Sequence, residues 1–246
     1  MSISGNPSST SAAGASSSVA GVLHNSVLDM LGSDITAGVL PEGHVLTLEK
    51  IQQQFGVSRT VARETMRLLE SLGLVTSRRR VGIIVQPKSS WRVFDPRVIW
   101  WRLSGADRDA QLRTLTELRI AIEPIAAAAA ARGASAEQRV KIRTIAAEMR
   151  ALGEAGNLSD FLDRDIHFHT MLLEAGGNEM FAALVDVVAV VLRGRTILGL
   201  MPHHPEPAAL DLHEAVAHAV AEGRGADAEN HMRQLLGEVR AAMQRF

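Results

Sequence analysis

Residues 56–85, GVSRTVARETMRLLESLGLVTSRRRVGIIV, restrict the fold of this 246-residue chain more than any other stretch. Ser58 follows a glycine turn and has a side chain that commonly caps a helix N-terminus, and Gly73 has the conformational freedom to end that helix. Two β-prone runs, 74–76 and 82–85, flank a run of three arginines, which predicts a hairpin with a basic tip. We expect the inward face of the helix to consist of residues at helical spacing, namely Val61, Thr65, Leu68 and Leu72.

Positive charge is concentrated around this helix. The whole chain has a formal net charge of -1, but residues 56–92 contain eight lysines and arginines against two glutamates, a local charge of +6. Arg59, Arg63 and Arg67 follow one another at four-residue spacing on the side opposite the apolar face. A helix N-terminus with Ser, Thr and Arg fits the DNA major groove, where arginine binds guanine edges and hydroxyls bind phosphates. A merely solvated charged face is the alternative, and the coincidence of turn, cap, arginine spacing and basic hairpin favours DNA.

Two shorter helices are expected before this one. Apolar residues at helical steps predict a helix from Val19 that ends at Gly38, and Thr47 is placed to cap a second helix that ends at Phe55. The order helix, helix, turn, helix and hairpin is that of a winged helix-turn-helix domain, expected over residues 19–86. Residues 1–18 are rich in Ser with almost nothing apolar to bury, so we expect a disordered tail there.

The motif G-V-S-R-T-x-x-R-E-x-x-R-x-L, followed by G-L-V and an arginine-rich run, resembles the winged helix-turn-helix of GntR-type bacterial transcription regulators. The resemblance implies that five residues contact the operator, Ser58, Arg59, Thr60, Arg63 and Arg79. One departure concerns the preceding helix, where many members have an arginine and this chain has Glu49. A carboxylate there repels phosphate, which indicates fewer DNA contacts from that helix and an altered operator preference.

The composition excludes several classes of protein. There are no cysteines, which excludes disulfides, thiolate metal sites and cysteine nucleophiles. No apolar run approaches the roughly 20 residues that span a bilayer, and the N-terminus lacks the basic-then-apolar order of a secretory signal. We therefore expect a soluble, cytoplasmic protein without a membrane partner.

Residues 87–106 are predicted to be a tryptophan-rich linker, because they follow a Pro/Ser stretch and contain all three tryptophans, Trp91, Trp100 and Trp101. Large rings are well suited to a seam between two domains, and a ligand-stacking site is the alternative. The pattern W-x-x-x-D-P-x-V-I-x-W also resembles the sugar-acid-responsive branch of the same family.

Residues 107–246 are predicted to form an antiparallel bundle of six or seven helices. Glycine and proline breaks separate six helical segments, at about 109–132, 136–153, 158–175, 178–200, 206–222 and 226–244. Pro124 lies inside the first of them, where we expect a kink or a restart. The fold class is therefore mainly α, a winged helix-turn-helix followed by an all-α effector-binding and dimerisation domain.

One polar group in this half of the chain has the composition of a metal site. Asp165 and His169 are four residues apart, so both side chains lie on one face of a helix and can hold one metal ion. His213, on a later amphipathic helix, is a candidate third ligand. The spacing alone also fits an ordinary surface or core pair.

D-x-x-F-H, then G-G-N and a later L-x-x-H, resembles the ligand-binding (FCD) domain of the FadR-like GntR subfamily, in which an Asp and three His hold a divalent metal that grips a carboxylate effector. The resemblance assigns three ligands, Asp165, His169 and His213, and places the fourth on Leu235, which cannot ligate. His231, one turn earlier, is a candidate substitute. The implied metal is Zn, Mn or Ni; alternatively the metal is lost, and the same residues hydrogen-bond the effector directly.

Two arginines, Arg119 and Arg193, interrupt apolar helices. A buried charge is costly unless it meets an anion, so each indicates either an effector contact or an internal salt bridge. Similar arginines line the effector site in this subfamily, which implies a small carboxylate, and the tryptophan segment implies an aldonic acid such as gluconate or galactonate.

These observations predict a ligand-responsive regulator, not an enzyme, that binds double-stranded operator DNA as a homodimer. The resemblance implies a repressor, because repression relieved by an effector is the commoner sign in such families, and the sequence itself does not distinguish a repressor from an activator. One alternative is a metal-dependent hydrolase or lyase in which Glu174 or Glu214 acts as the base. A second is an architectural DNA-binding protein whose helical half only dimerises.

Overall fold

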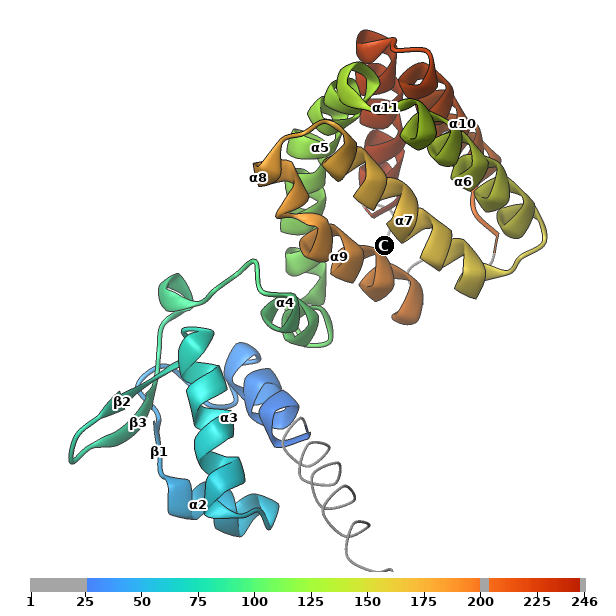
Figure 1. Cartoon of the computed structure of the whole chain (residues 1–246). Coiled ribbons are helices and arrows are strands. Elements are labelled where there is room, and N and C mark those ends of the chain that lie inside the picture. Colours follow the sequence, from blue (N-terminus) through green and yellow to red (C-terminus); the bar gives the residue numbers. More distant parts are fainter. Residues whose placement is uncertain (1–25, 200–203, 244–246) are drawn as a thin grey trace, which may run out of the picture. The chain divides into compact units, whose positions relative to one another are not determined.

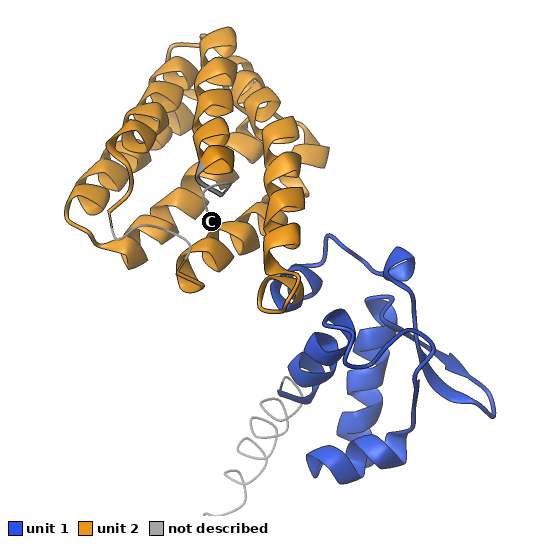
Figure 2. Ribbon diagram, turned by 180° about the vertical axis from the view of Figure 1, so that it is seen from behind, with its two compact units in different colours: residues 1–101 blue, residues 102–246 orange. Residues whose placement is uncertain are grey.

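A computed structural model describes residues 26–199 and 204–243 (Figure 1). The chain divides into two compact units, Met1–Trp101 and Arg102–Phe246 (Figure 2). The tail predicted at 1–18 and the start of the first predicted helix lie outside the described residues. In the described part, no helix is both long and apolar enough to cross a membrane.

The first unit is the predicted winged helix-turn-helix. After a helix whose described part covers residues 26–36, the elements are β1 (Val45–Leu46), α2 (Leu48–Phe55), α3 (Arg59–Ser71), β2 (Val75–Arg78) and β3 (Gly82–Val85). The strands form one antiparallel sheet in the order β1-β3-β2, in which Val45 pairs with Ile84 and Val75 with Val85. β2 and β3 form the wing, whose tip carries Arg79 and Arg80.

The turn before α3 forms as the sequence predicts. Gly56 adopts a left-handed conformation with φ 63° and ends α2, and the Ser58 hydroxyl accepts a hydrogen bond from the Val61 amide at 3.3 Å to begin α3. The inward face of α3 differs in part from the prediction. Its buried positions are Ala62, Thr65, Met66 and Leu69, with Leu72 just after the helix, whereas Val61 and Leu68 are only partly buried beside this core.

The tryptophans expected in a linker belong to the core of the first unit. They lie around a short 3₁₀ turn, η1 (Lys88–Ser90), and α4 (Pro96–Leu103). Trp91 and Trp101 are buried, and their indole N–H groups donate to the Gln86 carbonyl at 3.1 Å and to Asp29 Oδ1 at 3.0 Å. Both ring N–H groups are thus satisfied within the unit, as in a structural core.

The second unit is helical throughout its described residues. The helices are α5 (Arg108–Gly133), α6 (Ala136–Glu154), α7 (Leu158–Ala175), α8 (Glu179–Ala182), α9 (Val185–Ile197), α10 (Pro207–Ala221) and α11 (Gly225–Met243). The segment predicted as one helix over 178–200 is two, because the chain turns at Ala183 and Leu184 between α8 and α9. α5 runs through Pro124 without a restart.

α5 is the central helix of this bundle and packs against α7, α10 and α11 (Figure 1). Its alanines at 126, 127, 130 and 131 have no exposed surface, and the backbone of Gly176 lies against Ala129. Small side chains let neighbouring helices approach α5 closely. α7 therefore lies next to α5, and the polar side chains of both helices meet inside the bundle.

The contact between Gly32 and Trp101 gives a stability prediction. A Cβ at Gly32 would lie 2.5 Å from the Trp101 ring, so we expect Gly32→Ala to destabilise the first unit by about 1–3 kcal/mol despite the better helix propensity of alanine. Gly237→Ala in α11 is the matched control, because nothing lies within 4 Å of its added Cβ; it should stabilise by up to about 1 kcal/mol. Thermal and urea unfolding measure both, and equal stability of Gly32→Ala and wild type would contradict the packing described.

Candidate functional site

The residues expected to contact DNA are exposed on the first unit. Ser58, Arg59, Thr60 and Arg63 lie at the N-terminus of α3, and Arg79 lies at the wing tip. The oxygen of Ser58 already accepts the Val61 amide, so its hydroxyl proton is the group left for a phosphate. A helix N-terminus with exposed arginines and hydroxyls is suited to DNA binding.

A hollow of about 510 Å³ separates α3 from the wing and the start of α2. Arg63 and Arg79 line it from opposite sides, and Glu49 lies in it as well. The wing is fixed to α3 by Glu70, whose Oε1 accepts a hydrogen bond from the Ser77 amide at 2.7 Å. Arg67, Arg78 and Glu70 line the hollow as well, so its charged lining consists of four arginines and two carboxylates.

A second group of polar side chains is buried inside the helical unit. Arg119 and Glu123 come from α5, Asp165 and His169 from α7, and His213 from α10. None is more than 7% exposed. Because Arg119 and Glu123, like Asp165 and His169, are four residues apart, each pair lies on one helix face. We call these five residues the buried cluster.

The structure brings the three predicted metal ligands together. Nε2 of His169 lies 3.3 Å, and Nε2 of His213 lies 3.4 Å, from Oδ1 of Asp165. One ligand atom from each residue lies within 4.8 Å of the others. Nδ1 of His213 lies 2.6 Å from the Ala209 carbonyl. Nδ1 of His169 lies 2.6 Å from Glu123 Oε2, an ion-pair contact without hydrogen-bond geometry. A proton on each Nδ1 leaves both Nε2 lone pairs directed towards the Asp165 carboxylate, and Nε2 of His169 also lies 3.4 Å from Nη2 of Arg119.

This arrangement fits a divalent cation. Two imidazole lone pairs and a carboxylate oxygen converge, and among the described residues neither Asp165 Oδ1 nor His213 Nε2 has a hydrogen-bond partner. Mutual repulsion between such atoms is relieved when a cation lies between them. Leu235 is buried in the apolar core, and His231 does not join the group of three, so this set provides three ligands among the described residues.

The charges of the buried cluster compensate one another. Burial acts to raise the pKa of Glu123, but Arg119, at 2.5 Å, and His169 outweigh it and lower that pKa to about 2. Burial likewise acts to raise the pKa of Asp165, but hydrogen bonds from His169 and His213, when these imidazoles carry a proton on Nε2 in the absence of a metal ion, hold it well below its usual range. Both carboxyls are therefore ionised. Arg119 forms the internal salt bridge that was one of its two expected roles.

The structure places the two arginines of VVLRGRT differently. Arg193 is exposed on α9 and does not lie with the buried cluster, whereas Arg195 points inward. The pKa of Arg195 is lowered to about 10, mainly by burial and to a smaller extent by the positive charge of Arg119. The negative charge of Asp165 acts in the opposite direction. Arg195 has no carboxylate within 4 Å among the described residues. Its guanidinium is thus a partly desolvated cation next to the candidate metal site.

Sequence reasoning missed Arg195 and Glu123, although both have a signal. Arg195 continues the buried stripe of Val188, Val191 and Leu192 at steps of three and four, so the phase of α9 identifies it as inward-facing. Glu123 follows Arg119 by four residues, the spacing of a helical ion pair.

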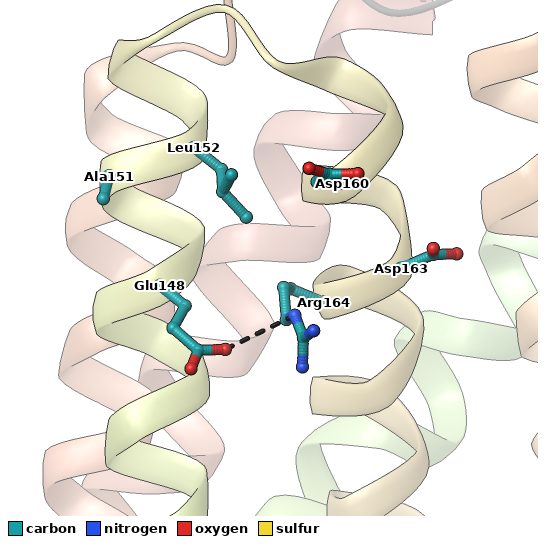
Figure 3. A pocket seen from close by; sticks show the side chains of 6 residues that line it. All are labelled: Glu148, Ala151, Leu152, Asp160, Asp163 and Arg164. Carbon is teal, nitrogen blue, oxygen red and sulfur yellow. Dashed lines mark ion pairs between the residues drawn. The ribbon is translucent and has the colours of Figure 1, made fainter.

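Two other features have no part in this site. A hollow of about 380 Å³ lies between α6 and α7, and Glu148 pairs with Arg164 in it at 3.3 Å. Figure 3 shows the side chains that line it, among which Asp160 and Asp163 are two more carboxylates, so the hollow does not suit an anion. The two candidate bases of the hydrolase alternative are also placed elsewhere, since Glu174 is exposed and Glu214 pairs with Arg150 at 2.8 Å.

Comparisons with known proteins match each of the two units to a different family model. Residues 23–85 match the bacterial regulatory proteins of the gntR family, and residues 114–238, more than half of the chain, match the FCD domain. YieP of Escherichia coli K12, an uncharacterised HTH-type transcriptional regulator, is 28% identical over 205 residues, covering 80% of this chain and 85% of YieP.

Two further proteins are similar over most of the chain. The galactonate operon transcriptional repressor of the same organism is 27% identical over 203 residues, covering 81% of this chain and 87% of the repressor. The solved structure of Lar, which controls the Listeria monocytogenes agr system, matches with a TM-score of 0.54 at 20% identity, over 91% of this chain and 97% of that one, and shows the shared fold. With a gntR-type DNA-binding unit followed by an FCD unit, the chain belongs to the GntR family of bacterial transcription regulators, which are not enzymes.

Proposed function

We propose that this regulator is a repressor that binds its operator as a homodimer and leaves it when a small carboxylate occupies the buried cluster. Asp165, His169 and His213 would hold a divalent ion, Zn, Mn or Ni, and the ion supplies positive charge to the effector carboxylate. Glu123 and the Ala209 carbonyl orient the two imidazoles through their Nδ1 atoms.

The observation that carries the proposal is the charge around Arg195. Arg119 and Arg195 balance the ionised Glu123 and Asp165, so the protein groups alone are close to neutral. A divalent ion makes this interior positive, and Arg195 forms no ion pair with a described residue, although the charge of Asp165 acts on it. An anionic ligand restores neutrality, and a carboxylate can accept hydrogen bonds from a guanidinium.

Two observations support an aldonic acid as the effector. A relative represses the galactonate operon, and the segment around Asp95 and Pro96 resembles the sugar-acid-responsive branch. An ion with three protein ligands keeps open positions for oxygen atoms, and an aldonic acid offers a carboxylate with hydroxyls beside it.

The DNA-binding part of the proposal assigns operator contacts to Ser58, Arg59, Thr60, Arg63 and Arg79. Two copies of a single recognition helix on a two-fold symmetric operator double the length of DNA that is recognised. Effector binding then shifts the population between arrangements of the two DNA-binding units, and the arrangement that fits the operator is depleted.

The effector prediction is tested by calorimetric titration of the purified full chain with gluconate, galactonate and other sugar acids, before and after chelation. We expect one acid to bind, binding to weaken after metal removal, and the bound acid to reduce affinity for DNA fragments selected on the protein. Binding unaffected by chelation would support direct recognition without metal, and no binding by any acid would contradict the effector class.

The two roles inside the cluster are separable by substitution. Asp165→Asn should abolish retention of the metal, measured by elemental analysis, because it removes the charged ligand. Arg195→Gln should retain the metal but weaken carboxylate binding by about 10- to 100-fold, as expected for the loss of a charge-assisted hydrogen bond worth about 1.5–3 kcal/mol. Arg143→Gln, on the exposed side of α6, is the matched control and should change neither. If Arg195→Gln and wild type bind the acid equally, Arg195 is not an effector contact.

The DNA interface gives opposite predictions for two residues of one hollow. Arg63→Ala should weaken operator binding by about 1–3 kcal/mol, as expected for loss of a base-edge contact. Glu49→Gln should strengthen DNA binding by up to about 1 kcal/mol, because it removes a like charge facing phosphates. Lys141→Ala on α6 is the control. Fluorescence anisotropy at several salt concentrations measures all three, and unchanged binding by Arg63→Ala refutes the assignment of α3.

A further inference from the structure

One carboxylate of the DNA-binding hollow has no partner within the described protein. Two carboxylates line the hollow between α2, α3 and the wing. Glu70 accepts hydrogen bonds from the amide and the hydroxyl of Ser77, at 2.7 and 3.4 Å, and thereby holds the wing. Glu49, in the first turn of α2, is exposed, and its side chain forms no ion pair or hydrogen bond with a described residue. Both oxygen atoms of Glu49 are therefore free acceptors.

The arginines of the hollow do not neutralise Glu49, although four of them line it. Arg67 pairs with Glu64 along α3 at 2.6 Å, and the other three form no ion pair within the described part of the chain. A carboxylate among these arginines lowers the positive charge that attracts phosphates. A surface that only had to bind the DNA backbone would thus be better without Glu49.

DNA offers a carboxylate few favourable partners. Phosphate oxygens repel it, and in the major groove guanine presents acceptors at N7 and O6 and thymine an acceptor at O4. The hydrogen-bond donors there are the amino groups of cytosine and adenine, and adenine also presents the N7 acceptor beside its amino group. Because an ionised carboxylate only accepts hydrogen bonds, cytosine is the base that suits it best.

We propose that Glu49 determines operator specificity by accepting a hydrogen bond from the 4-amino group of a cytosine. This inference rests on the proposed DNA interface, in which Arg63 lines the same hollow and contacts a base edge from α3. Glu49 weakens binding to every DNA backbone by charge repulsion, and a cytosine at the right position offsets that loss. Both effects increase the ratio of operator affinity to affinity for other sequences.

A purely structural role is the competing explanation for Glu49. A carboxylate in the first turn of a helix interacts favourably with the free N–H groups there, in addition to the cap that Thr47 provides by accepting the Lys50 amide at 3.2 Å. That role predicts a change in the stability of the first unit after substitution and no change in base preference. Base preference is therefore the decisive measurement.

Selection of operator sequences from random DNA by the full chain is the first test. At one position in each half-site we expect wild type to prefer cytosine and Glu49→Ala to accept all four bases, while the other positions keep their preferences. Glu42→Ala is the matched control, because Glu42 is an exposed carboxylate of the same unit that does not line the hollow. It should select the wild-type sequence. Circular dichroism and thermal unfolding check that both variants are folded.

Removal of the amino group from the DNA is the second test. The selected operator is synthesised with 2-pyrimidinone, which lacks the 4-amino group, in place of that cytosine, and fluorescence anisotropy measures binding. Wild type should bind the modified operator about tenfold more weakly, as expected for loss of a base-edge contact, relative to any change seen with Glu49→Ala. The modification weakens the base pair for both proteins alike, so the difference between them reports the contact.

The outcomes separate this inference from the proposed function. If wild type and Glu49→Ala select the same sequence, or lose the same affinity with the modified operator, Glu49 does not bind cytosine, and the contacts assigned to α3 are unaffected. A preference for adenine that depends on Glu49 also overturns the cytosine assignment. If wild type selects no sequence, the proposed operator contacts are overturned together with this inference.

Discussion

Five ionisable side chains are buried together in the helical unit. Their opposite charges lie close enough to one another to offset the free-energy cost of removing them from water. Each ionised carboxyl has a cationic or imidazole neighbour, from Arg119 beside Glu123 to His169 and His213 beside Asp165. Removing one partner would leave another buried charge uncompensated, which is costly. The packing of α5, α7 and α10 therefore depends on the cluster as a unit, beside which Arg195 forms no ion pair with a described residue.

α5 both carries part of the buried cluster and packs closely against the neighbouring helices. Its inner side presents Arg119 and Glu123 to the cluster, and the alanines that follow let α7 and α11 pack closely. In the first unit the comparable link is Glu70, which joins the recognition helix to the wing. In each unit a carboxylate thus links two elements, since Glu123 of α5 lies 2.6 Å from His169 of α7 and Glu70 of α3 accepts a hydrogen bond from the Ser77 amide of β2.

The sequence predicted the helical segments well because glycine, proline and capping residues separate them; α7 has the predicted limits, 158–175. It failed where helix phase decides the outcome. The face of α3 includes Ala62 and Met66, because these are as compatible with burial as Val61 and Leu68. In α9 the stripe of Val188, Val191 and Leu192 continues to Arg195, and the prediction of Arg193 did not follow that phase. The break at Ala183 and Leu184 has no glycine or proline to mark it.

Three consecutive residues of α9 point in three directions. Arg193 is on the surface, Gly194 lies under Leu103, whose Cδ1 is 2.8 Å from the position of a Cβ on that glycine, and Arg195 points to the cluster. Leu103 ends α4, the same helix whose Trp101 belongs to the core of the DNA-binding unit. Within the helical unit, the guanidinium of Arg195 and the packing of Leu103 on Gly194 therefore share one helical turn. A substitution that moves the backbone at Gly194 is expected to move Arg195 relative to the cluster as well.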